Sequence, residues 1–111
     1  MDNASTIEKI HKLAEKKKSA KVIKFLDSKD EQVVLEALKA LSGIGDEDSV
    51  NRIASMIDSE STAIRREAAG ALGGIGTEYA KTYLQHRMST EQDETVKKAI
   101  SEALHVIAAK K

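Results

Sequence analysis

An internal repeat of 31 residues constrains the fold of this chain more than any other feature. Residues 40–45 read ALSGIG and residues 71–76 read ALGGIG, so five of six positions are identical. Downstream, Ile53 returns as Leu84 and Ile57 returns as Met88 at the same offset. Repeats of roughly 20 to 50 residues are typical of proteins whose units bury their apolar faces by stacking on one another. We therefore expect a stack of similar units rather than one irregular core.

Weaker copies of the repeat extend to both ends of the chain. The offset stays at 31 towards the N-terminus and becomes 32 towards the C-terminus. We divide this single domain into units at about residues 1–29, 30–60, 61–92 and 93–111, the last of which stops after its first helix. The matching apolar positions are Ile10, Leu13, Val22, Ile23 and Leu26 in the first unit and Val96, Ile100, Ala103, Leu104 and Ile107 in the last.

Each unit predicts two helices. Apolar residues three and four positions apart mark one face of a first helix, which ends at Gly45 or Gly76, where a left-handed residue is favoured. Ala14 and Ala108 stand at this position in the outer units. A shorter apolar pattern follows each turn. The sequence thus predicts an all-α protein, an α-solenoid of antiparallel helix pairs, with about seven helices at residues 5–15, 18–27, 30–43, 47–58, 61–73, 77–88 and 92–109.

Helix starts can be predicted from capping residues. Ser-x-x-Glu or Ser-x-x-Gln patterns beginning at Ser5, Ser28 and Ser89 are typical of capping boxes. Asp46 and Thr77 follow the glycines, where an N-cap belongs. The other carboxylates of residues 27–31 and 46–49 also fall at helix starts, where the helix dipole favours negative charge.

The glycines at 73, 74 and 76 could instead belong to a phosphate-binding loop. Such a loop needs Lys-Ser or Lys-Thr after its last glycine, but Thr77, Glu78 and Tyr79 follow here and no strand pattern precedes. We interpret these glycines as helix ends and predict no cofactor. His11, His86 and His105 lack recognised metal-ligand spacing, and G-x-S-x-G is absent, so neither a metal site nor a catalytic site is expected.

Composition narrows the class of protein further. Lysine and arginine number 18, as do aspartate and glutamate, so no bulk charge draws this 111-residue chain to nucleic acid or membrane. The absence of cysteine excludes disulfides and thiolate chemistry. No apolar run reaches the length of a membrane span, and the N-terminus lacks the pattern of a signal peptide. We expect a cytoplasmic protein.

The pattern V-x-x-x-A-x-x-A-L-x-x-I-G is carried by Val33, Ala37, Ala40, Leu41, Ile44 and Gly45, and again by Ile64, Ala68, Ala71, Leu72, Ile75 and Gly76. It resembles the HEAT-like repeat of the short PBS-lyase type, although these repeats often begin Asp-Pro and this chain has no proline. The resemblance implies first helices on the convex side and second helices on the concave side. It also implies that the chain binds another protein.

Outward positions of the second helices are candidates for a protein-binding surface. Tyrosine and arginine are enriched in binding hot spots, so we predict a non-catalytic interaction surface here. Alternatively, Tyr83 is a core residue against the last helix and the lysines are merely solvated. The columns, at 31-residue spacing, are Lys17, Asp48 and Tyr79; Lys21, Arg52 and Tyr83; and Lys24, Ser55 and His86.

A lysine-rich stretch, Lys12–Lys24, supports a different function. It contains six lysines against the single acid Glu15, so it could contact phosphates as a nucleic-acid-binding patch. The balanced charge of the whole chain and the lack of interleaved aromatic residues argue against nucleic acid as a partner. A third hypothesis is an accessory subunit of a lyase-type enzyme.

The C-terminal end predicts a contact between two copies. Lys81 and Gln85 replace the apolar Val50 and Ala54 of the preceding unit, as a solenoid end requires. The final helix nevertheless crowds several apolar residues that it cannot all bury, so we expect a homodimer through this helix. The alternative is that the helix covers its own apolar residues and the protein is a monomer. The crowded residues are Leu104, Val106, Ile107 and Ala108, with charge added by Lys97, Lys98, Lys110 and Lys111.

Overall fold

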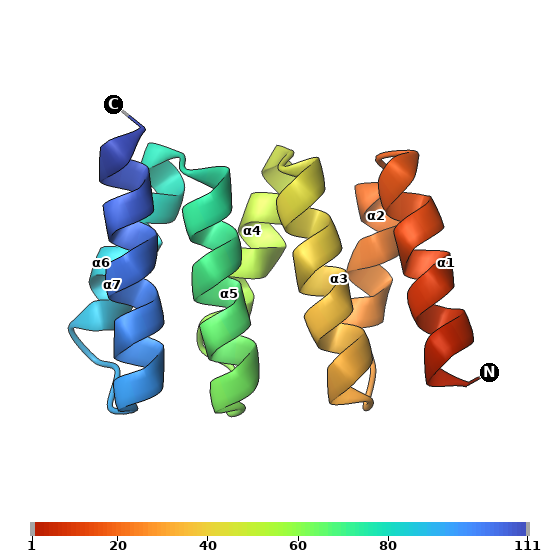
Figure 1. Ribbon diagram of the computed structural model, residues 1–111, viewed down its shortest axis with the longest axis horizontal. Coiled ribbons are helices and arrows are strands. Elements are labelled where there is room, and N and C mark those ends of the chain that lie inside the picture. Colours follow the sequence, from red (N-terminus) through yellow and green to blue (C-terminus); the bar gives the residue numbers. More distant parts are fainter. Residues whose placement is uncertain (1, 111) are drawn as a thin grey trace.

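The computed structural model describes residues 2–110, which form two layers of helices (Figure 1). One layer contains α1 (Asn3–Glu15), α3 (Glu31–Ile44), α5 (Thr62–Ile75) and α7 (Glu94–Ala109). The other contains α2 (Ser19–Ile23) with the 3-10 turn η1 (Lys24–Asp27), α4 (Glu47–Met56) and α6 (Glu78–Met88). The predicted stack of helix pairs is confirmed, and every predicted helix limit lies within two residues of the observed one when α2 and η1 are taken together.

The core repeats with the sequence. Val22, Ile53 and Leu84 occupy the same position in successive second helices, and all three are fully buried. Leu41 and Leu72 are their fully buried counterparts in the first helices. Full burial of each such side chain contributes about 1.5–3 kcal/mol, so the recurring positions hold neighbouring units together.

Helices end at glycines as predicted in the second and third units. Gly45 and Gly76 have φ of 66° and 72°, and their backbone N–H groups donate to the carbonyls of Leu41 and Leu72 at 2.9 Å. The first unit differs, because Ala14 cannot leave the helix as readily as glycine. There α1 continues, and Lys17 adopts the left-handed conformation instead, with φ of 55°. The second helix of this unit is correspondingly short and finishes as η1.

The helix starts confirm two of the predicted caps. Asp46 accepts from the N–H of Ser49 at 2.9 Å, and Thr77 accepts from the N–H of Ala80 at 3.1 Å. The carboxylate of Asp46 also accepts from the hydroxyl of Ser19 at 2.6 Å, which joins the first two second helices. These two hydroxyl contacts, from Ser19 first and then Ser49, hold the pKa of Asp46 below its ordinary value.

The predicted capping boxes are wrong. The N-caps at these helices are Asp2 and Asp30, together with Asp93, rather than the serines. A carboxylate can accept a charge-assisted hydrogen bond and complement the helix dipole at once. Ser28 instead accepts from the N–H of Asp30 at 3.0 Å, and Ser89 donates to the carbonyl of His86 at 2.6 Å.

The change of offset from 31 to 32 lies in α6, which has 11 residues where α4 has 10. In the turn that follows α6, the side chain of Glu91 is completely buried. Glu91 accepts from Arg65 at 2.9 and 3.0 Å and from Arg87 at 3.0 Å, while Arg87 also reaches Asp58 at 3.0 Å. This network, which the repeat pattern did not reveal, ties the turn after α4 to the turn after α6.

The C-terminal end is mostly covered. Ile107 is buried and Leu104 is half-buried, whereas Val106 is 46% exposed. Gln85 is exposed and Lys81 half-buried, in keeping with a polar end. A single chain does not test the predicted homodimer, and Lys111 lies outside the described residues. No helix within residues 2–110 is long and apolar enough to cross a membrane.

Candidate binding surface on the second helices

The predicted columns lie on the surface of the second-helix layer, as expected. Arg52 and Tyr83 are half-buried, and the other members are exposed. Arg52 forms a 3.7 Å ion pair with Asp27 at the end of η1, across the boundary between two units. Lys17 lies in the turn before α2. The exposed members are Lys17, Lys21, Lys24, Asp48, Ser55, Tyr79 and His86.

Two of these residues form an aromatic pair on α6. The hydroxyl groups of Tyr79 and Tyr83 lie 3.1 Å apart, and the rings meet edge to face with centroids 5.0 Å apart. Tyr79 is 50% exposed, whereas Tyr83 packs against the core. Tyr83 therefore packs against the core and also holds the ring of Tyr79 in place. It thus has both of the roles that the sequence suggested, as a core residue and as part of the surface.

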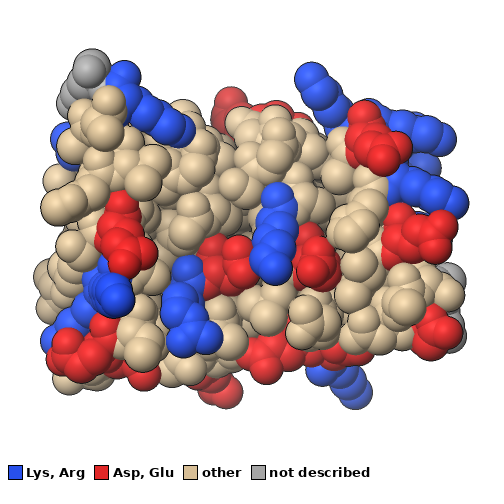
Figure 2. All heavy atoms as spheres, viewed as in Figure 1, with Lys and Arg blue, Asp and Glu red and all other residues tan. Residues whose placement is uncertain are grey.

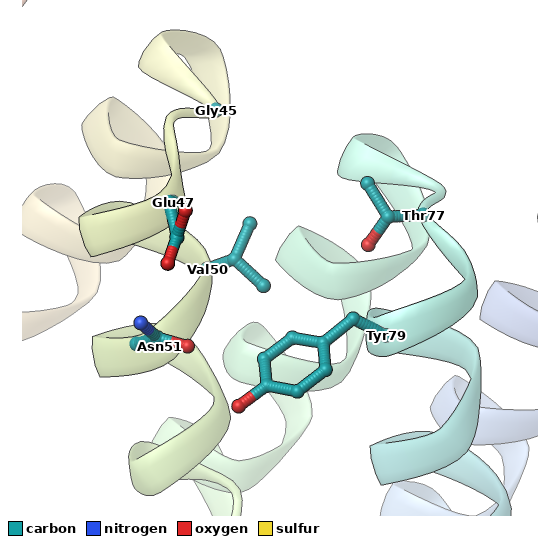
Figure 3. A pocket seen from close by; sticks show the side chains of 6 residues that line it. All are labelled: Gly45, Glu47, Val50, Asn51, Thr77 and Tyr79. Atoms are coloured by element: carbon teal, nitrogen blue, oxygen red, sulfur yellow. The ribbon is translucent and has the colours of Figure 1, made fainter.

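A groove between α4 and α6 adjoins this pair (Figure 3). It has a volume of about 540 Å³. Val50 points into the gap between the helices, Tyr79 reaches across from α6, and Glu47 and Asn51 lie on α4 opposite the ring. The remaining lining comes from Gly45 and Thr77.

The groove joins an apolar floor to polar walls. Hydrogen bonding to Tyr83, followed by partial burial and the negative charge of Glu47, raises the pKa of Tyr79. Its hydroxyl is therefore neutral at pH 7 and can donate or accept a hydrogen bond. The pattern of columns did not single out Glu47 and Asn51, although their spacing of four residues on one helix places them side by side.

A second groove lies at the N-terminal end of the stack, between α1 and the α2–η1 segment. It is lined by Lys9, Lys21 and Lys24 around Leu13 and Phe25, and its volume is about 340 Å³. The structure thus brings Lys21 and Lys24 together, but in a different groove from the one that Tyr79 lines. Lys9 lies outside the predicted Lys12–Lys24 patch. Its spacing of seven residues from Lys16, two helical turns, is the signal that could have added it.

Other titratable groups have structural roles. Asp93 caps α7, and a hydrogen bond from the Thr95 hydroxyl, followed by one from the Val96 N–H, lowers its pKa. His11 lies 3.2 Å from a carboxylate oxygen of Glu36 on the exposed surface of α1 and α3. Within the described part of the chain, no three histidine, aspartate or glutamate side chains gather as a metal site would require.

Comparisons with known proteins agree with this architecture. A family model described as HEAT repeats matches residues 19–105. The chain is also similar to a solved structure of epoxyqueuosine reductase with a tRNA-Tyr epoxyqueuosine-modified tRNA stem loop, with a TM-score of 0.64 and 23% identity. That match covers 69% of this chain and 21% of the other, so this chain spans about a fifth of its length and the likeness concerns the fold. No curated protein matches.

Proposed function

Because the chain belongs to the HEAT-repeat family, we propose that it is a non-catalytic protein-interaction module. Its binding surface is the face formed by α2, α4 and α6, the layer that the family resemblance places on the concave side. Helical repeats present such continuous surfaces because each unit contacts only its neighbours. The partner lies across the groove between α4 and α6.

The observation that supports this surface most directly is the exposed aromatic pair. The chain has two tyrosines and one phenylalanine, and neither tyrosine belongs to the fully buried core. Half of Tyr79 faces solvent while its hydroxyl is held by Tyr83 at 3.1 Å. A large side chain that is already held in place loses little conformational freedom when a partner covers it, so it is suited to anchoring an interface.

Binding without catalysis fits the electrostatics of the chain. Asp2, Asp46 and Asp93 have lowered pKa values because hydrogen bonds at helix N-termini stabilise their carboxylates. Glu91 lies in a buried ion pair with Arg65. These perturbed carboxylates are thus explained by folding, and none of them lines the groove. Tyr79 does line it, but the hydrogen bond to Tyr83 raises the pKa of Tyr79, which keeps its hydroxyl protonated rather than activating it as a base.

Site-specific photo-crosslinking in a native cell extract tests the proposal. A crosslinker at Asn51, in the groove, should capture a defined partner, whereas the same crosslinker at Glu102 on α7 should not. Excess wild-type protein should compete for this capture, but excess Tyr79→Ala should compete at least tenfold less well, as expected for the loss of a hot spot of about 2 kcal/mol. Tyr79→Ala should also keep the wild-type melting temperature, because half of the side chain is already exposed.

Two results would contradict the proposed surface. One is equal capture by the crosslinkers at Asn51 and Glu102. The other is competition by Tyr79→Ala that equals competition by the wild type.

A further inference from the structure

The groove at the N-terminal end collects positive charge from three separate elements. Lys9 comes from α1, Lys21 from α2 and Lys24 from η1, and all three line the same groove. None of the three forms an ion pair within residues 2–110. No carboxylate lines the groove, so its three lysines have no counter-charge among the lining residues.

The surrounding surface extends this charge. Lys16, Lys17 and Lys18 are exposed in the turn that follows α1. Figure 2 shows basic side chains gathered at the upper corner of that end of the stack, with acidic side chains among and below them. Glu8 and Glu15 are also seven residues apart, but they lie on a different face of α1 from Lys9 and Lys16, as the helical repeat of 3.6 residues requires. The basic side of α1 therefore faces the groove.

The left-handed turn contributes to this arrangement. Lys17 has φ of 55°, a conformation that costs a residue with a side chain about 1 kcal/mol or more relative to glycine. The corresponding turns of the next two units use Gly45 and Gly76. A lysine in this position keeps three consecutive positive charges exposed in the turn between α1 and α2.

The chemistry of the surface favours a phosphodiester chain. Lysines bind phosphate as point charges and need no fixed geometry. The large apolar side chains that are exposed within residues 2–110 are Tyr79 and Val106, and neither lines this groove, so an apolar anchor for a lipid bilayer is missing here. Phe25 is half-buried in the floor, which leaves no free aromatic platform for reading bases.

We propose that the groove and its flanking lysines bind the phosphate backbone of a nucleic-acid strand without sequence preference. The groove lysines Lys9, Lys21 and Lys24 contact successive phosphates, and the lysines of the turn extend the contact. This activity is separate from the protein-binding surface at Tyr79. Because it is electrostatic, the affinity falls steeply with salt, with a slope of roughly −0.7 per phosphate neutralised on a single strand.

Fluorescence anisotropy with a labelled 20-nucleotide uridine RNA, from 50 to 300 mM NaCl, tests the proposal. The triple variant Lys9→Gln/Lys21→Gln/Lys24→Gln should weaken binding at least tenfold at the lowest salt and reduce the salt slope by about two. The control Lys29→Gln/Lys39→Gln/Lys98→Gln removes the same charge from exposed positions elsewhere and should change affinity less than threefold. Circular dichroism should show that both variants keep the helical fold.

Further probes separate the sources of negative charge. A 20-base-pair DNA duplex should bind with the same dependence on the groove lysines, since it offers the same phosphodiester chemistry. Vesicles of phosphatidylserine and phosphatidylcholine, and polyglutamate, should bind more weakly than the RNA. Tyr79→Ala should leave the RNA affinity unchanged, so that this proposal and the protein-binding proposal can fail separately.

Three outcomes would overturn the proposal. The first is a wild-type protein that does not bind RNA at 50 mM NaCl. The second is an equal loss of affinity in the groove variant and its control. The third is tighter binding to vesicles or polyglutamate than to RNA, which would assign the groove to a membrane or to an acidic protein.

Discussion

At the residue scale, two glycines of α5 have opposite structural consequences. A Cβ atom at Gly73 would lie 2.7 Å from the Cβ and 2.9 Å from the Cα of Ala103 on α7, so glycine is needed for the close approach of these helices. A Cβ at Gly70, one turn earlier on the exposed side of the helix, would meet nothing within 4 Å. The same substitution therefore tests packing at one position and backbone entropy at the other.

We predict that Gly73→Ala lowers the free energy of unfolding by about 1–3 kcal/mol, because the backbone of α7 must move away. Gly70→Ala should raise it by roughly 0.5–1 kcal/mol, because alanine restricts the unfolded chain and favours the helix. Urea unfolding followed by circular dichroism measures both. Effects of the same sign for the two variants would show that the spacing of α5 and α7 is not as described.

At the element scale, the sequence could predict the helices but not all the contacts between them. A helix is marked in the sequence by local signals, the apolar spacing and the glycine positions, so the helix limits could be predicted within two residues when α2 and η1 are taken together. The cap at Asp30 was missed because Ser28 offers an equally plausible local pattern. The contact between Arg65 and Glu91 joins residues 26 positions apart, and no local pattern reports such a pairing.

The turn between α6 and α7 makes stability depend on pH. Burial raises the pKa of Glu91, but hydrogen bonds from Arg65, the Asp93 N–H and Arg87 outweigh it and lower the pKa from 4.5 to about 2. Because the folded-state pKa is depressed, this contribution to stability is fully present above about pH 4.5 and is lost as the pH falls towards 2. The ion pairs of Glu91 thus stabilise the folded protein more at neutral pH than at acidic pH.

We predict that Glu91→Gln costs about 3 kcal/mol at pH 7, since it leaves the largely buried Arg65 without a counter-charge. The difference from wild type should shrink steadily between pH 5 and pH 2. Glu60→Gln is the control, because Glu60 lies in the corresponding turn after α4 but is exposed, and it should have little effect at any pH. A pH-independent cost for Glu91→Gln, measured by denaturant unfolding, would contradict the assigned role.

At the scale of the whole molecule, the repeat explains why the candidate surfaces were only partly predictable. A period of 31 residues aligns Tyr79 with Asp48 and Tyr83 with Arg52; in the structure Tyr79 is exposed, whereas Tyr83 is half-buried against the core. The groove also needs Glu47 and Asn51 from the preceding unit, and the distance between units is set by packing rather than by spacing in the sequence. Likewise, the groove at the N-terminal end combines Lys9 of α1 with Lys21 of α2 and Lys24 of η1, and this combination depends on how α1 packs against the α2–η1 segment.

The C-terminal end of the stack decides the oligomeric state. Specific interfaces bury about 800 Å² on each partner, with an apolar centre. On α7, Ile107 is buried against the chain's own core and Leu104 is half-buried, which leaves Val106 as the large hydrophobic side chain that is markedly exposed on this helix. The polar Lys81 and Gln85 replace the apolar residues that a further helix would contact. These features favour the monomeric alternative over the homodimer that the sequence alone suggested.

We therefore predict that the protein sediments as a monomer of 12.1 kDa at micromolar concentration. Val106→Glu should leave this mass unchanged, because the side chain is already 46% exposed and loses no contact with a second copy. Its melting temperature should also stay close to that of the wild type. A mass that approaches twice the monomer value with rising concentration, and that returns to the monomer value in Val106→Glu, would restore the homodimer and identify α7 as its interface.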